Sequence, residues 1–218
     1  MTITVNGIGL YYEKTGAGAP LLLLHGNGED HAIFDALAAK LSADFTVYAL
    51  DSRNHGQSEK TDDYAYETMT ADVEMFLAAL GLADVYLAGF SDGAIIGLLL
   101  ALRKPSAIRK MALLGVNLSP ADFTDESLAF IRDTYAGTND PLLKLMLEQP
   151  QIALDAVRMV RVPTLLLAAE EDVFKPESFE RLAAAMPGAE LQVIAGHDHG
   201  SYVIGNDMMY PVLRTFFR

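Results

Sequence analysis

The fold of this chain is predicted most clearly by residues 85–97, which read Val85-Tyr86-Leu87-Ala88-Gly89-Phe90-Ser91-Asp92-Gly93-Ala94-Ile95-Ile96-Gly97. An apolar, β-prone run leads into a Gly-x-Ser-x-Gly sequence, and a small, apolar segment with helical patterning follows at once. This order of strand, tight turn and helix is typical of a nucleophile elbow, in which a serine hydroxyl projects from the carboxyl edge of a sheet. Ser91 is therefore a candidate nucleophile, although short motifs of this kind also occur where a serine only caps a helix.

The residues around Ser91 fit the same interpretation. Gly89 and Gly93 flank the serine, where side chains would collide because strand and helix cross closely. The backbone N–H of Asp92 lies at the start of the predicted helix, where it would point at negative charge that develops on a carbonyl oxygen. We expect the backbone of Asp92, rather than its carboxylate, to matter for the chemistry.

The composition limits the classes of protein to which this chain can belong. A length of 218 residues favours one domain with a substantial core. The formal net charge of −13 disfavours nucleic acids and anionic membranes as partners. The absence of cysteine excludes disulfides and a thiolate nucleophile. Residues 1–7 lack the pattern of a signal peptide, and no apolar run approaches the roughly 20 residues that span a bilayer, so we expect a cytoplasmic protein.

Apolar β-prone runs alternate with segments of helical spacing along the rest of the chain. Asn6-Gly7 between the first two runs is a strong hairpin signal. Alternation of this kind predicts a mostly parallel sheet that is covered on both faces. Residues 117–161 interrupt the alternation with two or three helical pieces and no strand. The predicted strands are 3–5, 10–14, 21–24, 46–50, 85–90, 110–114, 162–168 and 190–194, and the predicted helices include 32–41, 68–80, 179–186 and 208–217.

Polar side chains follow the predicted strands at the edge where functional groups gather in such sheets. A serine hydroxyl needs a base that removes its proton, and the base needs an acid that holds it in one tautomer. Elbow-containing enzymes supply these groups in the order serine, acid, histidine, and this chain has the same order. The strand ends carry His25-Gly26-Asn27, residues 51–58, Ser91, Asp172, and the pair His197 and His199.

Through these motifs the sequence resembles the α/β-hydrolase family, over essentially its whole length. The resemblance implies an α/β fold with an eight-stranded, mostly parallel sheet and helices on both faces. It further implies a single domain over residues 1–218, with a short helical lid inserted at about 117–161. The motifs are His25-Gly26, Asp51-x-Arg53-x-His55-Gly56-x-Ser58, Gly89-x-Ser91-x-Gly93, Glu170-x-Asp172 after an apolar strand, and a His-Gly after the last strand.

The acid is expected at Asp172, which fills the second acidic position of the family's Glu-x-Asp pattern. Glu170 is expected to form structural hydrogen bonds and Glu171 to be solvated. Asp172 would otherwise serve as a helix cap near the start of the next helix. Some relatives place the acid after the preceding strand, where the first carboxylate in this chain is Asp122.

The base is expected at His199, because the family's spacing after the last strand falls on this residue. His197 is the alternative, and we expect it to be a loop histidine exposed to solvent. By resemblance, the backbone N–H of Asn27 joins that of Asp92 as the second donor of an oxyanion hole. His25 is expected to be structural.

The run after the fourth predicted strand is expected to position a loop through hydrogen bonds from Arg53 and His55. Asn54 stands where the family usually has glycine. Asparagine tolerates a left-handed backbone, so the turn can survive this change.

These residues predict a serine hydrolase that cleaves a small to medium carboxylic ester through an acyl-enzyme. Phe123, Phe130 and Met146 of the lid are expected to line an apolar pocket, while most other apolar lid residues pack it onto the body. Ser91 excludes the branches of the family that use an aspartate nucleophile. Thioesterase, lactonase, perhydrolase and carbon–carbon bond hydrolase activities use the same triad and stay open. A non-catalytic ligand-binding protein with this fold is the alternative from another class.

Neither a metal nor a cofactor is expected. No His-x-x-x-His pair is present, and no glycine-rich dinucleotide fingerprint follows the first parallel strand. The expected partner is a small-molecule acyl substrate, with neither nucleic acid nor membrane. The sequence makes no prediction of oligomeric state.

Overall fold

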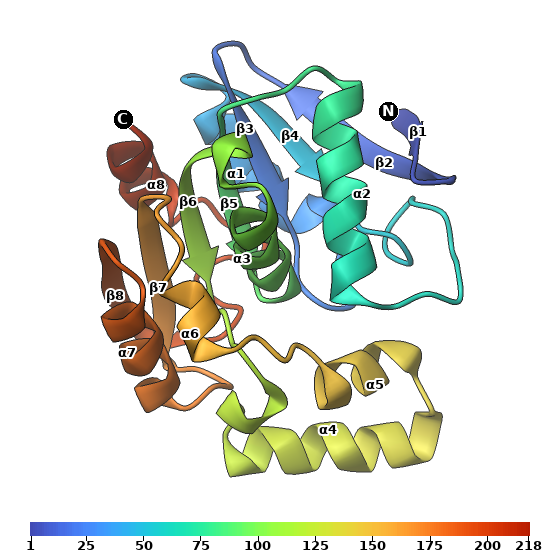
Figure 1. Cartoon of the computed structure of the whole chain (residues 1–218), viewed down its shortest axis with the longest axis vertical. Helices are drawn as coiled ribbons and strands as arrows, with labels where there is room; N and C mark the ends of the chain where they lie inside the picture. The colour runs from blue at the N-terminus through green and yellow to red at the C-terminus, as the bar shows by residue number, and fades with distance from the viewer.

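The apolar runs of the sequence form one eight-stranded sheet in the computed structural model, which describes residues 1–218 (Figure 1). The strand order is β1-β2-β4-β3-β5-β6-β7-β8. The pairs β1–β2 and β2–β4 are antiparallel, and all other neighbours are parallel, which confirms the predicted fold class. The strands are β1 (Thr2–Val5), β2 (Ile8–Thr15), β3 (Ala19–Leu24), β4 (Phe45–Leu50), β5 (Val85–Phe90), β6 (Ile108–Leu114), β7 (Thr164–Glu171) and β8 (Ala189–Asp198).

The hairpin between β1 and β2 turns at the predicted Asn6-Gly7 pair. Both residues have positive φ, 49° at Asn6 and 78° at Gly7. A two-residue turn with both residues in this region matches the right-handed twist of the strands that it joins.

Helices cover both faces of the sheet, and the alternation of side chains along each strand creates two cores. In β3, Leu22 and Leu24 belong to the core under α2, α3 and α7, whereas Leu21 and Leu23 belong to the core under α1 and α8. The central strands β3 and β5 are apolar along their length, as expected of parallel strands that are buried on both faces. The helices are α1 (Asp35–Leu41), α2 (Tyr66–Ala79), α3 (Asp92–Arg103), α4 (Asp125–Thr138), α5 (Pro141–Glu148), α6 (Leu154–Val157), α7 (Pro176–Ala185) and α8 (Tyr210–Phe217), with 3₁₀ turns η1 (His31–Phe34), η2 (Pro105–Ala107) and η3 (Pro120–Asp122).

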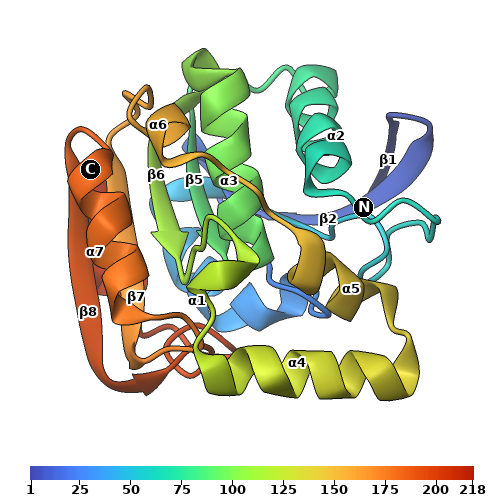
Figure 2. The same cartoon turned by 60° about the horizontal axis from the view of Figure 1, so that its bottom comes forward.

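Three helices, α4 to α6, lie between β6 and β7, where the sequence predicts helical pieces without a strand. Figure 2 shows α4 and α5 together at the end of the sheet to which the parallel strands point. The start of this segment is held to the loop after β7. Thr124 N–H donates to Val173 O at 2.9 Å, and Lys175 N–H donates to Asp122 O at 2.8 Å. The segment therefore covers the strand ends that carry the candidate residues.

Most elements differ from their predicted bounds by a few residues, and two of these differences have a clear cause in the structure. The predicted helix 32–41 begins with the 3₁₀ turn η1, which Asp30 caps through the N–H of Ala32. Strand β8 continues four residues beyond the predicted end at Ile194, because Asp198 still pairs with Glu171 after an irregularity in the register.

The longest helices, α2 and α4, have 14 residues each. None of the helices combines the length and the apolar character that crossing a membrane requires.

Candidate active site

Ser91 lies at a tight turn between β5 and α3. Its backbone has φ 51° and ψ −113°, a conformation that residues other than glycine rarely adopt. A Cβ on Gly89 would lie 2.3 Å from Gly93 O, and a Cβ on Gly93 would lie 2.1 Å from Leu24 O. Only glycine fits at these two positions, so the turn has the crowded geometry of a nucleophile elbow.

A chain of hydrogen bonds joins the three residues that the sequence selects. His199 Nε2 lies 3.1 Å from Ser91 Oγ, and His199 Nδ1 lies 2.8 Å from Asp172 Oδ1. The side chain of Asp172 is 2% exposed and that of His199 is 17% exposed. These distances allow a proton to pass from the hydroxyl to the imidazole while the buried carboxylate holds the other ring nitrogen.

The carboxylate and the imidazole are each held by their surroundings. Asp172 also accepts the N–H of Ala169 at 3.1 Å and that of Phe174 at 3.3 Å. The imidazole of His199 contacts two aromatic rings, with centroid distances of 4.9 Å to Phe90 and 5.3 Å to Phe174. Because Asp172 accepts from Nδ1–H, Nε2 remains free to accept the serine proton.

The alternative acids and base have other hydrogen-bond partners. His197 is a half-buried residue of β8 rather than an exposed loop histidine, and its Nδ1 lies 3.1 Å from Ser201 Oγ. Glu170 accepts the N–H of Gly196 at 2.7 Å. Asp122 accepts the N–H groups of Leu118 and Ser119 and pairs with Arg181. None of these three side chains is hydrogen-bonded to Ser91 or His199.

Gly115, directly after β6, makes room for the imidazole, and the sequence did not identify it. Its φ is +62°, and a Cβ there would lie 2.5 Å from Cε1 of His199. A side chain at this position would displace the ring from Ser91. A glycine that directly follows a buried strand is the only sequence signal of this contact.

Two backbone N–H groups lie at the candidate oxyanion positions. That of Asn27 donates no hydrogen bond within the chain, and that of Asp92 opens α3, where no intrahelical acceptor exists. Asn27 Nδ2 donates to Asp92 Oδ2 at 3.0 Å, so a side-chain bond joins the two positions.

The carboxylate of Asp92 has a role that the sequence did not predict. It is buried, with the residue 5% exposed, and it accepts Tyr66 Oη–H at 2.6 Å as well as the amide of Asn27. Asn27 Nδ2 also contacts Leu142 O of α5 at 3.3 Å. The buried carboxylate of Asp92 thus holds the loop after β3. The side chain of Asp92 therefore has a structural role in addition to the role expected of its backbone N–H.

The loop after β4 is held by Arg53 as expected, whereas His55 bonds only within the loop, its Nδ1 lying 2.8 Å from Arg53 O. Arg53 and Asp72, both buried, form two hydrogen bonds of 2.6 and 2.8 Å, and Asn54 adopts the left-handed region with φ 68°. His25 Nε2 accepts the N–H of Ser52 at 3.0 Å, and burial lowers the pKa of His25 to about 4. His25 is therefore a neutral structural group.

A cavity of about 630 Å³ opens beside Ser91 and His199. The three predicted pocket residues, Phe123, Phe130 and Met146, all line it. Phe123 is buried, whereas Phe130 is 68% exposed at the mouth. The remaining walls are formed by Asn27, Glu29, Phe90, Glu126, Ser127, Ile131, Leu143, Val173, Phe174, Gly200 and Ile204.

A family model described as alpha/beta hydrolase fold matches residues 19–143, more than half of the chain. The chain belongs to the α/β-hydrolase fold family. The matched part of this α/β-hydrolase includes Ser91 and both candidate oxyanion residues, while Asp172 and His199 lie beyond it.

Among its relatives, this α/β-hydrolase is 36% identical over 138 residues to human serine hydrolase BPHL, covering 60% of this chain and 47% of that protein. It is 25% identical to the putative carbamate hydrolase RutD of Azorhizobium caulinodans, covering 95% and 94% of the two chains. The matches to BPHL and to an uncharacterized hydrolase of Bacillus subtilis span less than half of the length of those two relatives. The solved enol-lactonase of Burkholderia xenovorans has the same fold, with a TM-score of 0.83, 23% identity, and coverage of 100% and 99% of the two chains.

Glu29 is the cavity residue of this α/β-hydrolase that the sequence missed. Its Oε2 accepts the N–H of Gly26 at 2.9 Å, and burial raises the pKa of its carboxyl to about 7. In the sequence, Glu29 is one acidic residue in a polar loop, and no motif distinguishes it from the solvent-exposed acidic residues of other loops.

Replacing Glu29 by glutamine is expected to stabilise the protein, and more so at about pH 8 than at about pH 5. The folded-state pKa of about 7 lies above the ordinary value of 4.5, so the folded carboxyl binds a proton more tightly. The stability of the wild type therefore falls as the pH rises through this window. Glutamine can still accept from Gly26 and has no charge to desolvate. Urea unfolding at both pH values measures the difference, and an equal effect at both would contradict the shifted pKa.

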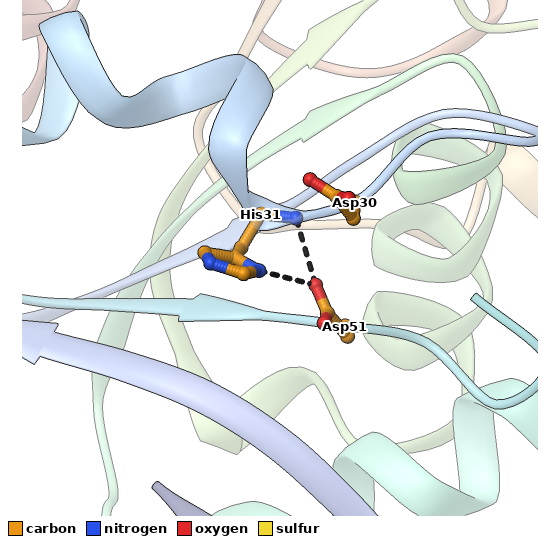
Figure 3. A group of neighbouring side chains, drawn as sticks. All are labelled: Asp30, His31 and Asp51. Atoms are coloured by element: carbon orange, nitrogen blue, oxygen red, sulfur yellow. Dashed lines mark hydrogen bonds and ion pairs between the residues drawn. The ribbon is translucent and has the colours of Figure 1, made fainter. Parts of the chain in front are cut away.

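A second group of acidic and imidazole side chains lies where the loop after β4 meets η1 (Figure 3). Asp30, His31 and Asp51 each offer a ligand atom within 4.8 Å of the others. Asp51 Oδ1 accepts both the backbone N–H and the ring Nδ1 of His31 at 2.7 Å, and Oδ2 accepts the N–H of Gln57 at 2.7 Å. These hydrogen bonds account for the group as a means of holding two loops together.

Proposed function

We propose that this protein is a serine hydrolase that cleaves a carboxylic ester of small to medium size through an acyl-enzyme, with Ser91, His199 and Asp172 as its catalytic triad. The observation that carries the proposal is the chain of hydrogen bonds from Ser91 through His199 to Asp172 at the wall of an apolar cavity. The hydrolase names of its relatives support the same class of reaction.

In the first half of the reaction, Ser91 Oγ attacks the carbonyl carbon of the ester while His199 Nε2 accepts its proton. Asp172 stabilises the imidazolium, and the N–H groups of Asn27 and Asp92 donate to the oxygen that becomes negative. The tetrahedral intermediate then expels the alcohol as its C–O bond breaks and the protonated His199 donates to the leaving oxygen.

In the second half, water takes the place of the alcohol. His199 accepts a proton from the water, whose oxygen attacks the acyl carbon bound to Ser91. The same two N–H groups hold the oxyanion, and collapse of the intermediate returns the proton to Ser91 Oγ and releases the carboxylic acid.

The size and lining of the cavity support a substrate of limited length. Its volume of about 630 Å³ lies within the range of ordinary small-molecule sites, and nine of its lining residues are hydrophobic. Asp172 and His199 argue against a ligand-binding protein without catalysis, because a binding site needs neither an acid nor a base.

A series of 4-nitrophenyl esters from acetate to palmitate tests this proposal through the release of nitrophenolate. We expect turnover of the short and medium acyl chains and a decrease for palmitate, the longest acyl chain of the series. If the protein increased the rate of nitrophenolate release from none of these esters, the proposal of an acyl-ester hydrolase would be contradicted.

A further inference from the structure

The charged groups around the cavity are mainly acidic. Glu29 and Glu126 line it, and no lysine or arginine does. His199 is the only basic group in the wall, and the proposed mechanism uses it as the base. A substrate with a carboxylate would find no opposite charge here, whereas a cation would find one.

Glu29 lies close to the serine. A Cβ built on Gly26 would lie 2.7 Å from Glu29 Oε2 and 3.1 Å from Ser91 Cβ. Glu29 Oε2 and Ser91 Cβ therefore lie no farther apart than the sum of these two distances. Glu29 Oε2 accepts one hydrogen bond, from Gly26, and Oε1 accepts none within the chain. One carboxyl oxygen next to the reaction centre is thus available to a ligand.

Aromatic rings form much of the remaining wall. Four phenylalanines, at positions 90, 123, 130 and 174, line the same cavity as Glu29. The faces of such rings attract cations, and a carboxylate among aromatic rings is a suitable environment for an ammonium group.

We propose that the cavity selects substrates that carry an ammonium cation near the scissile acyl bond, and that Glu29 determines this specificity. The inference rests on the proposed function, because it names the substrate class of the same site. The carboxylate of Glu29 attracts the cation, and the aromatic rings surround its alkyl groups.

The preference is expected to depend on pH through Glu29. Burial, with smaller contributions from the carboxylates of Asp92 and Asp30, raises the pKa of Glu29, while the N–H of Gly26 and His199 lower it; the net pKa is about 7. Glu126 of α4 also lines the cavity. Because the carboxyl of Glu29 becomes negative as the pH rises through about 7, attraction of a permanent cation increases in the same interval.

Two esters of nearly equal shape isolate the effect of charge. The 4-nitrophenyl ester of 4-(trimethylammonio)butanoate carries a permanent cation, and that of 5,5-dimethylhexanoate has a neutral tert-butyl group in its place. We expect the wild type to favour the cation by about tenfold in kcat/KM at about pH 8, as one attractive charge in a partly buried site allows. Glu29→Gln is expected to bring this ratio close to one, while Glu180→Gln on the exposed side of α7 leaves it unchanged.

The ratio of kcat/KM for the cationic and the neutral ester distinguishes a role of Glu29 in specificity from a role in structure. If Glu29 only positioned the loop, Glu29→Gln would affect both esters alike and keep the ratio, and this result would overturn the inference. In the wild type alone, a ratio that does not increase between about pH 6 and pH 8 would also overturn it.

Binding of the methyl ketones of the same two acyl chains distinguishes this inference from the proposed function. These ketones cannot be hydrolysed, and calorimetry gives their Kd for the wild type and for Glu29→Gln. Tighter binding of the cationic ketone that depends on Glu29 supports the inference even if neither ester is hydrolysed, in which case only the proposed function fails. Equal Kd values for the two ketones in the wild type overturn the inference.

Discussion

Replacement of Ser91 by alanine is expected to lower kcat for 4-nitrophenyl butanoate by at least about 10,000-fold. Ser91 Oγ is the atom that would form the acyl-enzyme, and His199 Nε2 lies 3.1 Å from it. Without the hydroxyl, the base has no nucleophile to activate, and only the oxyanion donors and substrate binding remain. Steady-state release of nitrophenolate measures the loss.

The matched control for this substitution is Ser106→Ala, at an exposed serine in η2. It should retain the wild-type kcat. Circular dichroism and thermal unfolding should show that Ser91→Ala keeps the fold, because the alanine removes a single oxygen. Retention of more than a tenth of the wild-type kcat in a folded Ser91→Ala protein would exclude Ser91 as the nucleophile.

The second large effect on kcat is expected from alanine substitution of His199, with His197 as the comparison. His199→Ala is expected to lower kcat by about 10,000-fold, since it removes the base between Ser91 and Asp172. His197→Ala is expected to stay within about threefold of the wild type, because its imidazole contacts Ser201 instead. His197 lies near the end of β8 and His199 directly after it, so each variant serves as the control for general damage to this segment.

The reverse result, an inactive His197→Ala and an active His199→Ala, would assign the base to His197. Equal loss in both variants, accompanied by a lower melting temperature, would mean that the integrity of this segment rather than one imidazole determines activity. Kinetics and thermal unfolding of the same preparations decide between these outcomes.

The features that the sequence predicted depend on local pattern and on chain order. Apolar runs specify the parallel strands, and the strand–turn–helix pattern specifies the position of Ser91. The carboxyl ends of parallel strands lie at one edge, so residues that follow β7 and β8 were expected beside the serine. The structure brings Asp172 and His199 to it.

The features that the sequence missed depend on contacts between distant segments. Gly115 matters because His199, far along the chain, packs against it. The carboxylate of Asp92 matters because Tyr66 of α2 and Asn27 both bond to it. Glu29 is unusual only because the fold buries its carboxyl. Partners of this kind are not encoded in a motif of a few residues.

Glu29 also relates stability to the proposed specificity. A partly buried carboxyl with a raised pKa lowers the stability of the folded state at neutral pH. Functional groups in an active-site cavity are a common reason for such a loss of stability. The two effects of Glu29→Gln, higher stability and loss of preference for a cation, are therefore expected together.

Ser91 is proposed to be an activated nucleophile, and reaction of the wild-type protein with a fluorophosphonate probes this role. The reagent modifies serines that an adjacent base activates, and so requires no knowledge of the natural substrate. We predict one adduct per chain, located at Ser91 by mass spectrometry of peptides and absent from Ser91→Ala. Absence of an adduct, or an adduct at another serine, would show that Ser91 is not the activated nucleophile.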